Sequence, residues 1–319
     1  MNSDTSMPSP ESVHISVLLN EAVDALAPKA GGRYLDGTVG MGGHSFAIME
    51  RTGGEGFLCG LDRDTQALEL ARIRLAPFGD RVHLVHTRYS EFEAALDGIG
   101  WDAVDGALID IGVSSLQIDS AERGFSFSSD GPLDMRMDRQ QKLTAYDVVN
   151  GWSREEIRHI LFEYGEERYA PAIAKKIVQA RETAPIETTL ELAELIRSAM
   201  PAAALREKQH PAKRSFQAIR IAVNDELASV DRMIQGAVPR LNRGGRLAVI
   251  TFHSLEDRIV KNGFAQFAKG CTCPPDFPVC VCGKTPDIKL VNKKPILPTQ
   301  QEIDENPRAR SAKLRVAEK

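Results

Sequence analysis

The sequence has few cysteines, few aromatic residues and no long apolar run. Among its 319 residues are 5 cysteines, and aromatic side chains make up 6%. So few cysteines, in an odd number, argue against the disulfide framework that stabilises small exported domains. The longest apolar stretches, such as 247–252, are strand-sized and far shorter than the roughly 20 residues that span a bilayer. The sequence therefore excludes a membrane-embedded protein, and we expect no membrane partner.

An export signal and a strongly basic composition are absent as well. Residues 1–14 carry neither a basic start nor an apolar stretch, so we expect a cytoplasmic protein with reduced thiols. The formal net charge is −4, so the whole molecule is not a polycation. Any surface for nucleic acid must therefore be local.

The first third of the chain alternates short β-rich runs with helical patterns. Strands are predicted at 33–36, 56–62, 81–86 and 103–110, with helices at 45–51 and 65–75 between them. This alternation predicts an α/β fold, a parallel sheet covered by helices on both faces.

The pattern changes after residue 115, and the length predicts two domains at roughly 150 residues each. A glycine-rich, charged stretch at 122–139 precedes helical periods from about 146 to 200, with capping-box spacing at Ser153 with Glu156 and at Thr188 with Glu191. A helix at 224–241, a turn at 243–245 and a strand at 246–252 then resume the first pattern. We therefore expect a sheet domain, 1–115 and 216–319, interrupted by an all-helical domain, 116–215.

The C-terminal segment has a different charge from the rest of the chain. Residues 284–319 hold nine basic and five acidic side chains, a net +4. This basic tail is either a surface for a polyanion or an ordinary solvated terminus.

A glycine-rich turn, Asp36–His44, follows the first predicted strand. A dinucleotide fingerprint reads G-x-G-x-x-G, and Gly40 and Gly42 fit it, but position 45 is serine. The pattern D-x-x-x-G-x-G fits better and resembles the first motif of S-adenosylmethionine-dependent methyltransferases. A turn without a ligand is the alternative.

Asp62 and Tyr89, at the ends of the next two predicted strands, could bind a nucleoside. Asp62 ends the second strand, where a carboxylate can accept hydrogen bonds from ribose hydroxyls, and Arg63 beside it would allow an NADP interpretation. Asp62 could instead cap the following helix. Tyr89 follows the third strand, where its ring could lie against adenine or belong to the core.

Asp110 ends the fourth predicted strand. Because the carboxyl ends of parallel strands line the ligand crevice of an open sheet, Asp36, Asp62 and Asp110 should converge there. Three carboxylates suit a cationic ligand rich in hydroxyls, such as S-adenosylmethionine. The alternative for Asp110 is a loop-capping carboxylate.

Four further segments contain side chains that could act in binding or catalysis, but each also has an ordinary structural interpretation. The loop 130–138 places acidic and basic residues around two methionines, and it could act in function or form surface salt bridges. The stretch 210–220 is basic with one aromatic residue, which suits phosphate contacts and base stacking, or an ordinary helix start. His253, in 252–258, could lie at the same sheet edge or be structural.

The fourth segment is C-x-C-x6-C-x-C, formed by Cys271, Cys273, Cys280 and Cys282. Four thiolates suit tetrahedral zinc, but the spacing is not the usual C-x2-C knuckle, so no metal ligand is assigned. Cys59 lies in a predicted strand and is expected in the core.

Taken together, these motifs resemble one family. The chain is similar to the bacterial 16S ribosomal RNA cytosine-N(4) methyltransferases (RsmH/MraW) from about residue 14 to 318, most specifically at Gly42–His44, Asp110–Ser115, Glu122–Phe127, Asp130–Asp138, Phe252–Lys261 and Asn306–Ser311. The resemblance implies a Rossmann-like class I methyltransferase sheet with an inserted helical domain, S-adenosylmethionine as cofactor, and a decoding-region cytidine of 16S RNA, within the small subunit rather than DNA, as substrate. By matching positions it implies cofactor contacts from Gly42, Gly43, His44, Asp62, Tyr89, Asp110 and Gln117.

The reaction would need a proton acceptor beside the cytosine amine. Asp110 is the first candidate catalytic residue, with Asp134 and His253 behind it. DNA amino-methyltransferases usually place a proline pair and an aromatic residue after this acid, but 111–113 reads Ile-Gly-Val, so the ring that stacks on the base is unidentified. The competing hypotheses are an NADP-dependent oxidoreductase and a non-catalytic RNA-binding assembly factor.

Overall fold

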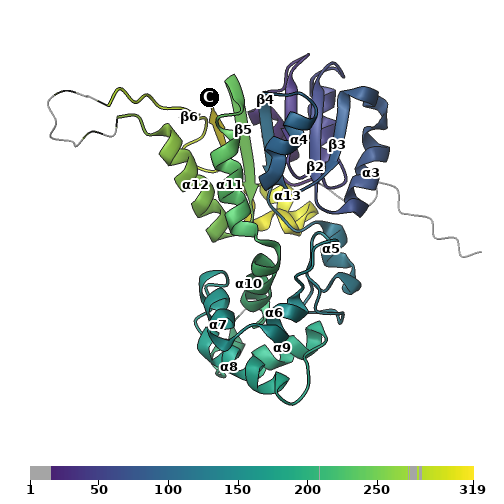
Figure 1. Ribbon diagram of the computed structural model, residues 1–319, viewed down its shortest axis with the longest axis vertical. Coiled ribbons are helices and arrows are strands. Elements are labelled where there is room, and N and C mark those ends of the chain that lie inside the picture. Colours follow the sequence, from purple (N-terminus) through teal and green to yellow (C-terminus); the bar gives the residue numbers. More distant parts are fainter. Residues whose placement is uncertain (1–15, 208, 272, 274–278, 280–281) are drawn as a thin grey trace, which may run out of the picture. The chain divides into compact units, whose positions relative to one another are not determined.

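The protein folds as two compact units. A computed structural model describes residues 16–319 except 208, 272, 274–278 and 280–281. One unit contains the described residues of 16–112 and 227–319, and the other contains those of 113–226 (Figure 1). In the described part of the chain, no helix is both long and apolar enough to cross a membrane.

The first unit is built on one seven-stranded sheet with the order β3-β2-β1-β4-β5-β7-β6. The first five strands in the chain are parallel where they pair, and β7 runs antiparallel to β5 and β6. The strands are β1 Arg33–Asp36, β2 Phe57–Asp62, β3 Val82–His86, β4 Val104–Asp110, β5 Leu241–Thr251, β6 Lys289–Leu290 and β7 Lys313–Glu318. The order reverses between β1 and β4, and this is where open α/β sheets bind ligands. The predicted α/β class is confirmed.

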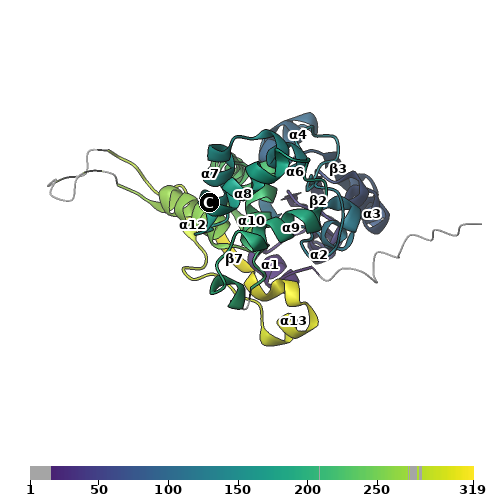
Figure 2. The ribbon, with the colours of Figure 1, turned by 90° about the horizontal axis from the view of Figure 1, so that it is seen from below.

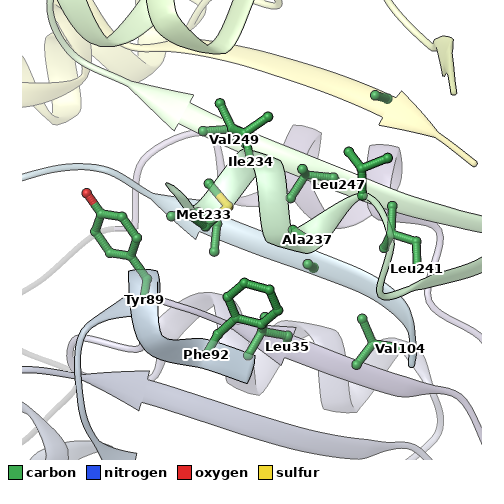
Figure 3. Packing of buried hydrophobic residues seen from close by; sticks show 14 of the residues in the cluster. Leu35, Tyr89, Phe92, Val104, Met233, Ile234, Ala237, Leu241, Leu247 and Val249 are labelled. Carbon is green, nitrogen blue, oxygen red and sulfur yellow. The ribbon is translucent and has the colours of Figure 1, made fainter. Parts of the chain in front are cut away.

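Helices cover both faces of this sheet. They are α1 Leu19–Leu26, α2 Gly43–Arg51, α3 Thr65–Leu75, α4 Phe92–Gly98, α11 Glu226–Ala237, α12 Ser254–Ala268 and α13 Gln300–Glu305, with 3₁₀ turns at Ala76–Arg81, Tyr89–Glu91 and Pro307–Ser311. Because neighbouring strand residues point to opposite faces, Leu35 joins the apolar cluster with Phe92 and Met233, whereas Tyr34 joins the cluster with Ile48 on the other face. Figure 3 shows the first of these clusters.

The end of the chain is a core strand, so the expectation of a terminal tail is wrong for these residues. In β7, which pairs with β5 and β6, Leu314 and Val316 are buried in the apolar cluster that contains Ile48. Arg315 Nε donates to Asp257 at 2.7 Å, so part of the basic charge is neutralised inside the unit. The strand was missed because its apolar alternation is short and flanked by basic residues.

The turn expected at 243–245 lies inside a longer strand. β5 begins at Leu241, and its pairing with β4 shifts register between Val104 and Gly106. Gly244 has φ +79°, a left-handed value that glycine tolerates. The backbone kink is therefore absorbed as an irregularity of the strand.

The second unit is helical, and two of its helices begin as the sequence predicts. Its helices are α5 Ser115–Asp119, α6 Ala145–Gly151, α7 Arg154–Glu163, α8 Ala170–Arg181, α9 Thr189–Ser198 and α10 Lys213–Asn224, with 3₁₀ turns at Ala121–Arg123 and Ala204–Arg206 (Figure 2). The capping boxes at Ser153 and Thr188 are both formed. The expected insertion, 116–215, lies within this unit, and α10 continues past its expected end.

Candidate functional site

The glycine turn between β1 and α2 needs glycine for conformation and for space. Gly40 has φ +54° and Gly42 has φ +82°, left-handed values that cost other residues about 1 kcal/mol or more. At Gly43 a Cβ atom would lie 2.0 Å from Ser16 Oγ. The turn therefore brings bare backbone to the carboxyl edge of the sheet, at the start of a helix.

Asp36, at the end of β1, holds this turn in place. Its carboxylate accepts hydrogen bonds from Ser45 Oγ at 2.6 Å and from the Thr38 N–H at 3.0 Å. Burial raises the pKa of Asp36 to about 6. Ser45, the residue that breaks the dinucleotide pattern, therefore has a defined role as a donor to a buried acid.

Asp62, at the end of β2, ties the second strand to the same turn. Its Oδ2 accepts from the Gly40 N–H at 2.8 Å and its Oδ1 from the Asp64 N–H at 2.9 Å. Burial raises the pKa of Asp62. The helix-cap alternative is wrong, because the side chain that caps α3 is that of Asp64, which accepts from the Gln66 N–H. Each carboxylate oxygen has a second lone pair and can still accept a ligand hydroxyl.

Asp110, at the end of β4, is the acid with unmet hydrogen-bonding capacity. Its side chain is 19% exposed, yet Oδ1 is buried and has no hydrogen-bond partner among the described residues. Burial, reinforced by the charges of Asp36 and Glu256, raises the pKa of Asp110 to about 8. A buried carboxylate oxygen without a donor is costly, so this position suits a cation or a hydrogen-bond donor from a ligand.

His44 faces the other oxygen of the same carboxylate. Its Nε2 lies 3.0 Å from the Val17 carbonyl oxygen, so this nitrogen carries the hydrogen, and its Nδ1 lies 4.0 Å from Asp110 Oδ2. At this distance the imidazole does not satisfy the acid. The sequence-predicted residues Gly42, Gly43, His44, Asp62 and Asp110 all belong to this one unit.

Tyr89 belongs to the core, and its predicted contact with adenine stays a prediction. It begins the 3₁₀ turn after β3 and is buried in the cluster with Leu35 and Ile109. A Cβ atom at Gly37 would lie 2.9 Å from Tyr89 Cβ, so the Tyr89 side chain begins directly beside the glycine turn. Figure 3 shows its hydroxyl pointing away from the neighbouring Phe92 ring.

Gln117 belongs to the second unit. It is buried in α5, and its Oε1 accepts from the Ser114 N–H at 3.1 Å. Its predicted cofactor contact stays a prediction.

The residues that follow β5 add an aromatic ring to the edge of the sheet. Phe252 is half-buried, and a Cβ atom at Gly112 would lie 3.0 Å from Phe252 Cε2. Sequence reasoning did not identify this ring, because β5 lies far from Asp110 along the chain. The pairing of Asp110 with Ile250 brings the ends of β4 and β5 together.

His253 has a structural role. Its Nδ1 accepts from the Glu256 N–H at 3.4 Å at the start of α12, and its Nε2 lies 2.8 Å from Glu256 Oε1. Glu256 Oε2 also accepts from the Phe252 N–H at 2.8 Å. His253 therefore fixes the turn after β5, and Asp110 is the better candidate for proton acceptance.

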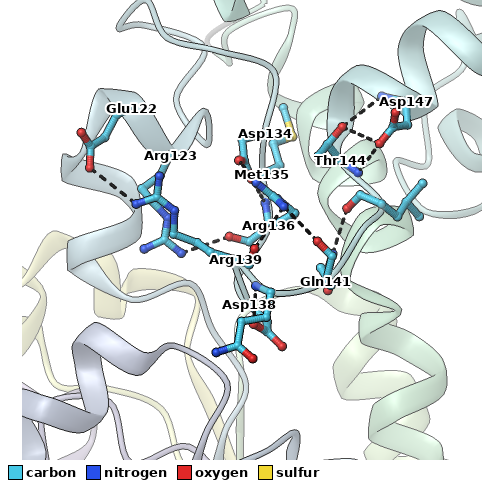
Figure 4. Close-up of polar contacts among 12 residues, drawn as sticks. Glu122, Arg123, Asp134, Met135, Arg136, Asp138, Arg139, Gln141, Thr144 and Asp147 are labelled. Atoms are coloured by element: carbon cyan, nitrogen blue, oxygen red, sulfur yellow. Dashed lines mark hydrogen bonds and ion pairs between the residues drawn. The ribbon is translucent and has the colours of Figure 1, made fainter.

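The 130–138 segment in the second unit forms an internal polar framework (Figure 4). Arg136 binds Asp134 through two parallel hydrogen bonds, 2.9 Å from Nε and 2.7 Å from Nη2. Burial alone would raise the pKa of Asp134, but the hydrogen bonds and charge of Arg136 outweigh it and lower the pKa. A carboxylate committed to arginine in this way is a poor proton acceptor.

The basic 210–220 stretch is also largely structural. Phe216 is buried in the core of the second unit, so it does not offer a face for base stacking. Arg220 donates to both Glu226 oxygens, at 2.9 and 2.8 Å. Lys213 is exposed, and the predicted phosphate contacts of this stretch stay a prediction.

The expectation for the buried thiol is met. Cys59 lies in β2 and is fully buried, and burial raises the pKa of its thiol to about 12. Among the other cysteines, Cys280 lies outside the described residues.

Comparison with known proteins gives a consistent picture. Ribosomal RNA small subunit methyltransferase H from Paenibacillus sp. (strain JDR-2) is 58% identical over 314 residues, which cover 96% of this chain and 99% of the relative. The protein of the same name from Nitratidesulfovibrio vulgaris (strain DP4) is 55% identical over 98% of both chains. An rRNA methylase structure from Streptococcus thermophilus aligns over 94% of this chain and 92% of its own at 11% identity, with a TM-score of 0.40. The MraW methylase family profile matches residues 11–319, so the chain belongs to the MraW methylase family.

Proposed function

We propose that this protein methylates small-subunit ribosomal RNA with S-adenosylmethionine, at the N(4) amine of a decoding-region cytidine in 16S RNA. The observation that carries the proposal is the buried Asp110 Oδ1 beside the glycine turn, a carboxylate oxygen without a donor. The names of the relatives support small-subunit RNA as the substrate. The cytidine and its N(4) atom rest on the motif resemblance described above.

The residues of the first unit fit such a methyl donor. The backbone at Gly42 and Gly43 allows close approach, Asp62 can accept from ribose hydroxyls, and Tyr89 packs beside the turn. Asp110 supplies negative charge for a cationic ligand. The donor, when bound, supplies an electrophilic methyl group on a positively charged sulfur.

Asp110 also suits the proton transfer. The cytosine N(4) lone pair forms the new C–N bond while the carbon–sulfur bond breaks and its electron pair stays on sulfur. The amine then has one proton too many, and Asp110 in its carboxylate form accepts it. A pKa of about 8 places this acid in the range in which it can accept and then release a proton near neutral pH.

Phe252 is our candidate for the ring that stacks on the base. It is half-exposed and packs over Gly112, two residues after Asp110. This supplies an aromatic face near the acid, which residues 111–113 lack. Stacking of this kind contributes about 1–3 kcal/mol per base.

The alternatives fit less well. Ser45 is needed as a donor to Asp36, so the turn is not a dinucleotide fingerprint with one glycine lost. The names of the relatives, which are methyltransferases, favour an enzyme over a binding factor without turnover.

The test is methyl transfer by the purified full chain. The protein is incubated with S-adenosylmethionine carrying a labelled methyl group and with small subunits from cells that lack the modification. Nuclease digestion and mass spectrometry then locate the label, which we expect on N(4) of one decoding-region cytidine. Label on another nucleotide, or on cytosine carbon, would overturn the site assignment, and bound donor without transfer would favour the assembly-factor hypothesis.

A further inference from the structure

We propose that Cys271, Cys273 and Cys282 bind a structural zinc ion. They lie in the segment 269–288 between α12 and β6, which we call the excursion. Their sulfur atoms all lie within 4.8 Å of one another. This site is separate from the methyl-transfer chemistry and does not rest on the proposed function.

The sulfur geometry favours a metal over a disulfide. Cys282 Sγ lies 3.6 Å from Cys271 Sγ, whereas a disulfide holds its sulfurs about 2.05 Å apart. Two thiolates on tetrahedral zinc, each about 2.3 Å from the ion, lie roughly 3.8 Å apart. The observed spacing is close to that value.

The backbone supports a thiolate at Cys271. The Cys273 N–H donates to Cys271 Sγ at 3.4 Å. A donated hydrogen bond favours the charged form of its acceptor, and the thiolate is the form that binds metal.

The described residues of the excursion form no apolar core that could bring these thiols together. Its ends are anchored, since the Asp287 N–H donates to the Phe267 carbonyl at 2.9 Å and Ile288 is buried. Between these anchors, none of the described residues in 269–287 is buried, and Val279 is 69% exposed. A metal crosslink supplies the stabilisation that burial supplies elsewhere, as in small metal-bound folds.

The ligand type selects the ion. The cluster contains thiols alone, and soft thiolates select zinc, copper(I) or iron–sulfur clusters over magnesium and calcium. Zinc brings no redox chemistry, which suits an exposed site in a protein expected to keep its thiols reduced. The sequence holds a fourth thiol nearby, Cys280, which lies outside the described residues, so the proposal rests on the other three.

Metal analysis of the tag-free full-length protein, expressed with added zinc, tests the site. We expect about one zinc per chain, at least a tenfold lower content in the C271S/C273S/C282S variant, and an unchanged content in the C59S control. Zinc far below stoichiometry in the wild type, full zinc in the triple variant, or stoichiometric iron would overturn the proposal.

A second measurement covers a triple variant that does not fold. A mercurial thiol reagent is titrated into folded wild-type protein while a chromogenic chelator reports released zinc. We expect release in proportion to the exposed thiols modified, with methyl transfer still measurable afterwards. No release on full modification of the exposed thiols would overturn the site, whether or not methyl transfer survives.

Discussion

Asp110 and Asp134 are both largely buried acids, but they lie in opposite electrostatic environments. Asp134 meets the guanidinium of Arg136 through two hydrogen bonds, and its pKa is lowered. Among the described residues, no arginine or lysine forms an ion pair with Asp110, and burial raises its pKa to about 8. Asp134 is therefore neutralised by Arg136 within the protein, whereas Asp110 can still be paired with a bound ligand. The difference separates an acid that maintains a fold from an acid poised for a ligand.

The largest expected effect is on methyl transfer when Asp110 is replaced. Asp110→Asn keeps the shape and removes the proton acceptor, so the rate should fall by about 10²–10⁴-fold. Single-turnover transfer to small subunits measures it. Asp134→Asn is the matched change in the paired environment and should affect stability more than the rate per folded molecule.

Stability distinguishes this loss from misfolding. A folded pKa raised above the unfolded value gives stability that is present at low pH and is lost as pH rises through about 8. Asn cannot ionise and does not suffer that loss. Ligand-free Asp110→Asn should therefore melt no lower than wild type at pH 8, and a fall of several degrees would mean that Asp110 maintains the fold instead.

The second-largest expected effect is on the free energy of unfolding when the ion pair between Asp134 and Arg136 is broken. Arg136→Leu leaves Asp134 without its partner and removes the hydrogen bonds to the carbonyls of Arg139 and Gln141. Because both side chains are about one-fifth exposed, we expect a loss of about 2–4 kcal/mol in the free energy of unfolding, at or below the range for buried pairs. Urea titration followed by circular dichroism measures it.

Arg139→Leu is the control for this measurement. Arg139 lies 4.0 Å from Glu122 at an exposed site, where an ion pair contributes at most about 1 kcal/mol. Equal losses in the two variants would show that the buried geometry of Asp134 and Arg136 carries no special stability.

The contrast also shows what sequence can and cannot predict. The three acids could be placed at one sheet edge, because each ends a strand and parallel strands end together. Salt bridges were one alternative for loop 130–138, but the pairing of Arg136 with Asp134 could not be selected, since a charged loop has many possible pairings. The role of Ser45 became visible only when its hydroxyl was seen on Asp36.

Long-range pairing accounts for most of what was missed. Phe252 reaches the edge beside Asp110 because β5 pairs with β4, and β7 completes the sheet from the end of the chain. Local periodicity carries no information about such partners. Helix starts were predicted better, because a capping box at Ser153 or Thr188 involves residues only three positions apart.

The third-largest expected effect is on RNA use when Phe252 is replaced, with Phe216 as the control. Phe252→Leu removes an aromatic face at the sheet edge and should weaken RNA use by roughly 5–150-fold in kcat/KM, from about 1–3 kcal/mol of stacking. Donor affinity should not change, and Phe252→Tyr should retain most activity. Steady-state transfer together with calorimetric donor binding separates these terms.

Phe216→Leu is the matched change in a buried ring. Phe216 lies in the core of the second unit, so this variant should lose about 1 kcal/mol or more of stability without a selective effect on donor or base. If Phe252→Leu behaves in the same way, Phe252 is a packing residue and the stacking ring lies elsewhere.

The smallest effect is a pH dependence of donor binding. In the ligand-free protein at pH 7, a pKa of about 8 leaves Asp110 mostly protonated. A cationic donor favours the carboxylate, so binding should release roughly one proton, and affinity should rise by up to about tenfold per pH unit until pH 8 and then level off. Asp36, with a pKa of about 6, adds to the dependence of donor affinity on pH only at lower pH. The other titratable groups facing Asp110 are Glu256 and His44.

Calorimetry in two buffers of different ionisation enthalpy counts the released protons directly. Wild type and Asp134→Asn should release the same number at pH 7, because the lowered pKa of Asp134 keeps it ionised with or without the donor. Asp110→Asn should release almost none. If the observed enthalpy of wild type is the same in both buffers, then Asp110 is already a carboxylate before the donor binds, and the unpaired acid at the sheet edge does not differ in charge from the paired one.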